Sequence, residues 1–127
     1  MKVLLRTSIK KYGFGLLNAA DFKAKIISNG VGGLQLEIDH QQVHAQLIGT
    51  FNAYNLLTIY AVARLLEQEK LDVLTSISQL ESVEGRFQYV KTENNIVGIV
   101  DYAHTPDALK NVLKTIKSIR TGNEKVI

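Results

Sequence analysis

The stretch Ile96-Val97-Gly98-Ile99-Val100-Asp101-Tyr102-Ala103-His104-Thr105-Pro106-Asp107 decides the fold class. Residues 96–100 are a continuous apolar run, which is typical of a central parallel strand covered on both faces. Thr at the N-cap, Pro at the first helical position and an acidic residue in the first turn then predict a helix that begins after Thr105. A buried strand that leads into a capped helix indicates an α/β protein.

The residues after this stretch predict a β-α-β unit. The buried stripe of the helix is expected at Leu109, Val112, Leu113, Ile116 and Ile119, and its solvated face at Lys110, Lys114 and Lys117. Gly122 is expected to close the helix, and Lys125-Val126-Ile127 to begin the next strand. Because that strand is only begun, we expect the chain to be an internal piece of a longer protein.

Upstream, the pattern predicts a β-hairpin. Residues 23–28 fit a short strand that the turn dipeptide Asn29-Gly30 ends. Residues 34–39 and 43–47 alternate apolar and polar side chains, which predicts two half-buried antiparallel strands.

Two helices are expected between the hairpin and the apolar strand. From Phe51 to Glu67 apolar residues cover most of a helix surface, so we predict a largely buried helix. A shorter helix is predicted from Asp72 to Leu80. Glu84-Gly85 breaks the pattern, and a domain boundary is expected there, between residues 1–84 and 85–127.

The composition excludes several classes of protein. The 127 residues carry a net charge of +3 without a block of Lys and Arg, so no nucleic-acid partner is expected. The absence of Cys excludes disulfides, thiolate metal sites and cysteine nucleophiles. The apolar run Val3–Leu5 is too short for a signal peptide, and no stretch is long enough to span a bilayer. We expect a soluble, cytoplasmic protein with no membrane insertion.

Polar residues at two places suit a nucleotide. Asn52 and Asn55 fall on one face of a first helical turn, and amides both donate and accept, as the edge of a nucleobase requires. On spacing alone, capping of the helix by Asn52 is the commoner role. Asp101 lies where open α/β sheets bind ligands, at a strand end beside a helix N-terminus that favours anions. His104 there would bind the nucleotide or, more commonly for a lone His, brace the loop.

Other polar residues are weaker candidates for a binding site. Arg86, in Gly85-Arg86-Phe87, offers a planar fork for phosphate or carboxylate, although a lone Arg at a strand start is usually a solvated charge. His40 and His44 are interpreted as exposed hairpin residues, and no metal site is expected. The chain contains no G-x-x-x-x-G-K-[ST] phosphate loop, so any use of ATP needs residues outside it.

The order Gly-x-Phe-Asn-x-x-Asn at 49–55, Gly-Arg-Phe at 85–87 and Asp-Tyr-Ala-His-Thr-Pro-Asp-Ala-Leu at 101–109 resembles the ATP-dependent Mur ligases. Tyr12-Gly13-Phe14 and Ala20-Asp21-Phe22 look similar as well. The resemblance implies that residues 1–84 are the end of a P-loop-type central domain, a hairpin plus two helices that lack the P-loop. Residues 85–127 would be the truncated start of a Rossmann-like C-terminal domain.

The resemblance also implies an activity. Such a ligase uses ATP and Mg2+ to make an acyl phosphate on UDP-MurNAc-L-Ala-D-Glu, which a diamino acid, here expected to be meso-diaminopimelate, then attacks. The full-length enzyme is expected to be monomeric and this chain alone inactive, with no catalytic or metal-binding residue of its own. By position, the nucleotide contacts would be Asn52 and Asn55 at adenine, Asp101 at the ribose, Arg86 from the hinge, and His104 and Thr105 nearby.

Two alternatives stay open at this point. One is another ligase of the same superfamily, similar to cyanophycin synthetase or folylpolyglutamate synthase, against which the Asp-Tyr-Ala-His-Thr-Pro string argues. The other is a non-catalytic nucleotide-binding module, against which the unfinished last strand argues. A P-loop encoded upstream would exclude the second.

Overall fold

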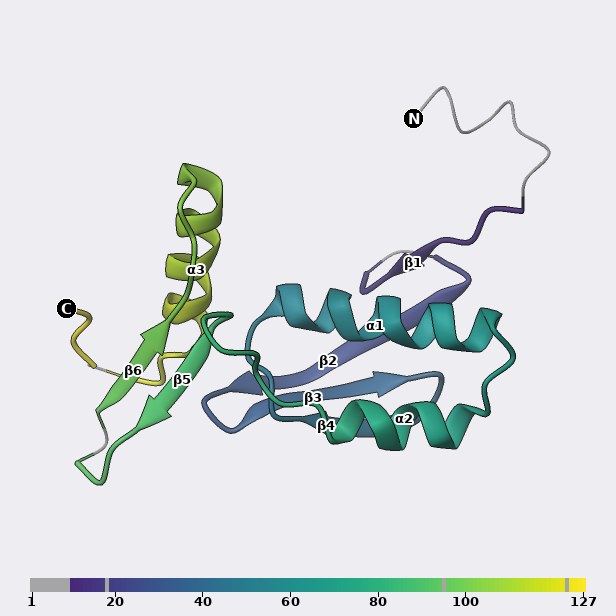
Figure 1. Ribbon diagram of the computed structural model, residues 1–127, viewed down its shortest axis with the longest axis horizontal. Helices are drawn as coiled ribbons and strands as arrows, with labels where there is room; N and C mark the ends of the chain where they lie inside the picture. The colour runs from purple at the N-terminus through teal and green to yellow at the C-terminus, as the bar shows by residue number, and fades with distance from the viewer. Residues whose placement is uncertain (1–9, 18, 95, 123) are drawn as a thin grey trace.

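The computed structural model describes residues 10–127 except 18, 95 and 123, so the predicted apolar run Val3–Leu5 lies outside it. The described chain has a mixed α/β fold in which one sheet carries two helices and a separate pair of strands carries a third (Figure 1). The elements are β1 Phe14–Gly15, β2 Phe22–Gly30, β3 Gly33–Ile38, β4 Gln41–Ala45, α1 Thr50–Leu65, α2 Lys70–Ser78, β5 Gln88–Lys91, β6 Val97–Val100 and α3 Pro106–Ile119.

The predicted antiparallel hairpin is confirmed as β3 and β4. Strand β2 pairs antiparallel with β3 on the side opposite β4. The short β1 extends the sheet parallel to β2. The turn predicted at Asn29-Gly30 is wrong, because β2 continues to Gly30. The Asn29 side chain is used otherwise: its Oδ1 accepts a hydrogen bond from the Gly49 N–H at 2.9 Å, which ties the end of β2 to the start of α1.

Helices α1 and α2 both pack on this sheet, and α1 crosses it above β2 and β3 (Figure 1). Alternate strand residues face the helices and form the main core: Ala24, Leu34, Leu36, Ile38, Val43 and Ala45, with Leu56, Leu57 and Tyr60 of α1 and Val73, Leu74 and Ile77 of α2. The alternation in β3 follows from its period of two, which sends Gln35 and Glu37 to the other face.

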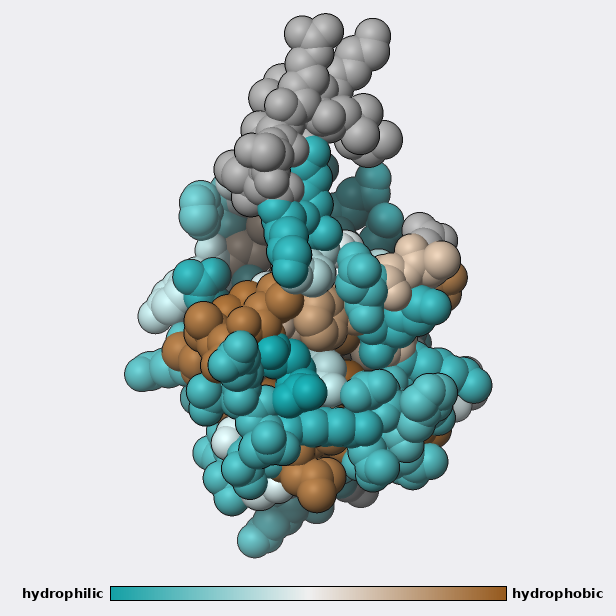
Figure 2. Space-filling view, turned by 90° about the vertical axis from the view of Figure 1, so that its right-hand side faces the viewer, coloured by the Kyte–Doolittle hydropathy of each residue, from teal (hydrophilic) through white to brown (hydrophobic). Residues whose placement is uncertain are grey.

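The prediction that the first long helix is largely buried is wrong for the described chain. Ile59 is 47% exposed and Val62 51%, because only one side of α1 meets a sheet. Leu66 and Leu71, at the α1–α2 connection, are exposed as well. On this side of the molecule hydrophobic residues interrupt the hydrophilic surface (Figure 2).

The last strand pair differs from the expected topology. Strand β6 was predicted to be a parallel strand covered on both faces, but in the described residues it pairs only with β5, antiparallel. Val100 is half exposed, so its side of the pair is not fully covered by the described residues. Residues 125–127, predicted to begin a strand, form none.

The predicted start of the last helix is confirmed. Thr105 is the N-cap of α3, its Oγ1 accepts a hydrogen bond from the Ala108 N–H at 3.3 Å, and Pro106 occupies the first helical position. The predicted stripe is only partly correct, because Ile119 is buried while Leu109 and Leu113 are half exposed. The helix ends at Ile119, before Gly122, with Arg120 already extended. No helix in the described part of the chain is both long and apolar enough to cross a membrane.

Candidate functional site

The three motifs found in the sequence meet at Phe87. Its side chain is 1% exposed and forms a small core with Ile48, before α1, and Ile119, at the end of α3. Its ring lies edge-on to Phe51, with the centroids 5.8 Å apart and the planes at 67°. Its backbone N–H donates to Asp101 Oδ2 at 2.8 Å. One buried residue therefore connects the start of α1, the Gly-Arg-Phe segment and the end of β6.

The asparagine pair lies on one face of α1, as its spacing predicts. The alternative that Asn52 caps the helix is wrong, because the N-cap residue is Gly49, three positions earlier. Asn52 is 9% exposed, and its Nδ2 donates to the Ile48 carbonyl at 2.9 Å. Asn55 is exposed, and its Nδ2 donates to Asn52 Oδ1 at 3.1 Å. Asn52 thus orients the amide of Asn55, whose carbonyl oxygen has no partner among the described residues.

Gly49 allows α1 to begin close to α3. Its φ is +101°, and a Cβ there would lie 2.7 Å from Cε1 of Phe51 and 3.0 Å from Cγ2 of Thr115. A larger residue would push the two helices apart and displace the first turn that carries the asparagines. The Gly of Gly-x-Phe-Asn is thus a packing requirement of the site.

Asp101 binds the protein with both oxygens. Oδ2 accepts from the Phe87 N–H at 2.8 Å, and Oδ1 from the Ala103 N–H at 2.7 Å. A carboxylate offers about four lone-pair positions, so two acceptor positions remain for a ligand. The ribose contact assigned to Asp101 stays a prediction. What the structure adds is that this carboxylate also holds the Gly-Arg-Phe segment.

The remaining candidates are Arg86, directly before Phe87, and His104 and Thr105, shortly after Asp101. All three are exposed. The Nδ1 of His104 donates to the Tyr102 carbonyl at 2.9 Å, so this side chain braces the loop and presents its Nε2 outward. Thr105 Oγ1 is used as the helix cap. Arg86 makes no ion pair within the described residues. Nucleotide contacts by these three side chains stay predictions.

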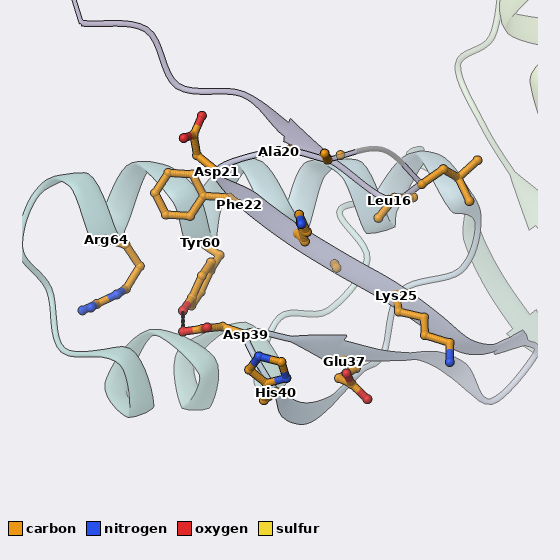
Figure 3. A pocket seen from close by; sticks show the side chains of 15 residues that line it. Leu16, Ala20, Asp21, Phe22, Lys25, Glu37, Asp39, His40, Tyr60 and Arg64 are labelled. Atoms are coloured by element: carbon orange, nitrogen blue, oxygen red, sulfur yellow. Dashed lines mark hydrogen bonds between the residues drawn. The ribbon is translucent and has the colours of Figure 1, made fainter.

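A second polar cluster lies at a hollow of about 870 Å³ along β2, which no sequence pattern indicated (Figure 3). The Tyr60 hydroxyl donates to Asp39 Oδ2 at 3.0 Å, and Lys70 Nζ lies 3.2 Å from the same oxygen. The bond from Lys70 holds the pKa of Asp39 below its usual range, while burial and then Asp39 raise the pKa of Tyr60. The cluster joins α1, α2 and the β3–β4 turn. His40 and His44 are exposed on this hairpin, as predicted.

The Asp39 cluster makes stability depend on pH. Since the pKa of Asp39 is lowered by folding, its contribution is present above the unfolded pKa and lost as pH falls through the folded one. Asp39→Asn should therefore destabilise the chain at pH 7, by at most about 1 kcal/mol for so exposed a pair, and should cost less at pH 3. Urea unfolding at both pH values measures this. Glu37→Gln, in β3 and without an ion pair in the described residues, is the control, and an equal cost of Asp39→Asn at pH 3 would contradict the assignment.

Residues 85–127 match the family described as Mur ligase, glutamate ligase domain, so the match begins at the Gly-Arg-Phe segment. Together with the sheet, the capped helix and the converging motifs, this match makes the chain similar to the Mur ligases. It is 48% identical over 122 residues to the UDP-N-acetylmuramoyl-L-alanyl-D-glutamate--2,6-diaminopimelate ligase of Cytophaga hutchinsonii, covering 96% of this chain and 25% of that protein. The chain thus spans about a quarter of the length of the curated relatives it matches.

Solved structures agree on the fold. A structure of a UDP-N-acetylmuramoyl-L-alanyl-D-glutamate--2,6-diaminopimelate ligase matches with a TM-score of 0.67 and 29% identity, over 88% of this chain and 24% of that one. UDP-N-acetylmuramate-alanine ligase of Thermotoga maritima matches with a TM-score of 0.74 and 24% identity, over 85% of this chain and 26% of that one. At that identity the second match shows the fold alone.

Proposed function

We propose that this chain is part of an ATP-dependent ligase that joins meso-diaminopimelate to UDP-MurNAc-L-Ala-D-Glu through an acyl phosphate. The observation that carries the proposal is the Asp101–Phe87 hydrogen bond, which brings the strand-end carboxylate, the Gly-Arg-Phe segment and the asparagine helix to one place. The 48% identity to a ligase of that name supports the substrates. The full-length ligase is proposed to be cytoplasmic and monomeric.

The proposal divides the chain at Gly85. Residues 1–84 would be the end of the central, P-loop-type domain and residues 85–127 the start of the Rossmann-like C-terminal domain. Two features support the division. The family match starts at residue 85, and β5, β6 and α3 pack around Phe87 in a small core that is separate from the main core and to which residues 1–84 contribute Ile48.

The residues present fit the adenosine end of ATP. Asn55 offers an oriented amide, Asp101 spare acceptor positions for ribose hydroxyls, and Arg86 an exposed cation for a phosphate. ATP, when bound, supplies the phosphoryl group that activates the peptide carboxylate. These side chains would bind and orient the nucleotide, as positioning is most of what phosphoryl transfer asks of a protein. We assign the phosphate loop and the Mg2+ ligands to other parts of the full-length ligase.

The test begins with the open reading frame that contains this sequence. Its product is the full-length ligase. With Mg2+ present, this ligase is expected to release phosphate from ATP only when UDP-MurNAc-L-Ala-D-Glu and meso-diaminopimelate are both added. L-Lysine in place of meso-diaminopimelate is expected to support little release. Turnover that does not depend on the UDP-linked dipeptide would contradict the proposal. Turnover with L-lysine but not with meso-diaminopimelate would show that lysine is the amino acid that is added.

Asn55 provides a test of base recognition. Asn55→Leu should keep the helix, because Leu is the better helix former and the position is exposed. The full-length variant should lose ATP-over-GTP preference, measured as the ratio of kcat/KM values, by about 5- to 100-fold, the equivalent of one lost buried hydrogen bond. Asn111→Leu, the same change at an exposed position of α3, is the control. A lower Tm with the preference intact would show that the pair is structural only.

A further inference from the structure

Arg86 stands between two residues in the left-handed conformation. The φ angles are +69° at Gly85 and +48° at Phe87. A bulky residue such as Phe rarely adopts positive φ, because its side chain then strains the backbone. Such a conformation persists only where neighbouring groups hold it, so the segment 85–87 must be fixed by contacts around it.

Those contacts come from both sides of the segment. The Phe87 N–H donates to Asp101, the Gly85 carbonyl accepts from the Tyr102 N–H at 3.0 Å, and the Gly85 N–H donates to Oε1 of Gln88 at 3.2 Å. The Phe87 ring is locked in its small core. The Tyr102 ring lies directly over Gly85, where an added Cβ would clash with Cε2 of that ring. We call residues 85–87 with Asp101 and Tyr102 the clasp.

The strain in the clasp is not explained by packing of Arg86 itself. Its side chain is exposed and has no ion pair within the described residues. Burying Phe87 needs no left-handed backbone in itself, since a strand residue buries its side chain at negative φ. The two left-handed residues fix the direction of the backbone at Arg86, directly before the Phe87 N–H that binds Asp101.

We propose that the clasp is a positioning device for Arg86, with Gly85, Phe87 and Tyr102 as positioning residues of the nucleotide site. The inference rests on the proposed function, in which Arg86 and Asp101 bind ATP. Asp101 accepts from the Phe87 N–H, so one carboxylate connects the ribose end of the ligand to the backbone that carries the cation. A disturbed clasp should therefore weaken ATP binding selectively.

Gly85→Ala in the full-length ligase breaks the clasp, because the added Cβ meets the Tyr102 ring and Ala disfavours the left-handed conformation. We expect the KM for ATP to rise about 10- to 100-fold, the range of effects of a misplaced binding group. The KM for UDP-MurNAc-L-Ala-D-Glu should stay unchanged. Gly98→Ala in β6 is the matched control, since the nearest atom to its Cβ is the Val90 carbonyl oxygen at 4.0 Å.

A double-mutant cycle with Arg86→Met shows whether the clasp acts through Arg86. In the Arg86→Met background, Gly85→Ala should add little to the KM for ATP. The same rise in both backgrounds would overturn the inference, as would an equal rise in the KM for the UDP-linked dipeptide.

Should Gly85→Ala fail to fold, Tyr102→Ala tests the same point, because that ring is 66% exposed and its removal inserts nothing. Tyr102→Ala should raise the KM for ATP severalfold when Arg86 is present and should add little in the Arg86→Met background. An unchanged KM in the presence of Arg86 overturns the inference. An inactive wild-type ligase, in contrast, would refute the proposed function.

Discussion

Replacing Asp101 by Ala in the full-length ligase is expected to raise the KM for ATP roughly 10- to 150-fold, the equivalent of about 1.5–3 kcal/mol for lost hydrogen bonds to a charged group. Two losses add here. The ribose loses its proposed acceptor, and the Phe87 and Ala103 N–H groups lose theirs, which releases the clasp. The KM for UDP-MurNAc-L-Ala-D-Glu should change little, because neither loss touches that substrate in the proposed arrangement.

Asp107→Ala is the matched control for this prediction. Asp107 is an exposed acid in the first turn of α3, so its removal changes the charge of the same loop without touching Phe87. Its KM for ATP should stay close to that of the wild type. An unchanged KM in Asp101→Ala would refute the assignment of Asp101, and a common rise for both substrates would indicate a general loss of structure.

The sequence predicted best what neighbouring residues determine. The N-cap Thr105 followed by Pro106 is local chemistry, and α3 begins as expected. The alternation in residues 34–39 likewise predicted β3, because one face of the strand is buried against helices. The asparagine pair was placed on one helix face by the helical period alone.

What the sequence could not predict depends on contacts between distant residues. An apolar run fits a central parallel strand, but only the neighbours of β6 decide whether it is one, and here the described neighbour is antiparallel. The cap at Gly49 instead of Asn52 depends on Asn29, twenty residues earlier. The Gly-Arg-Phe motif drew attention to Arg86, whereas the role of Phe87 depends on its contacts with Ile48, Ile119 and Asp101.

The 127-residue chain on its own is expected to bind no ATP and to associate in solution. Of the nucleotide contacts it carries only the proposed adenosine side and Arg86, and it has no phosphate loop, the element whose backbone cradles the phosphates. The outer side of α1 leaves Ile59, Val62 and Leu65 exposed, and contiguous apolar surface of this kind promotes association. The strand pair β5–β6 is also marginal, since two strands seldom form a stable sheet unaided.

Calorimetry with ATP and Mg2+ on the purified chain, with light scattering on the same sample, measures both properties. We expect no saturable heat and a mass above that of one chain. Val62→Lys, on the exposed side of α1, should lower the scattered mass without restoring ATP binding, because association and ligand binding have separate causes. Leu57→Lys, on the buried side of the same helix, should instead unfold the chain, since Leu57 is fully buried in the main core. Saturable micromolar binding by a monomer would show that these residues form a complete nucleotide-binding module, and the division of the site between this chain and the rest of the ligase would then be wrong.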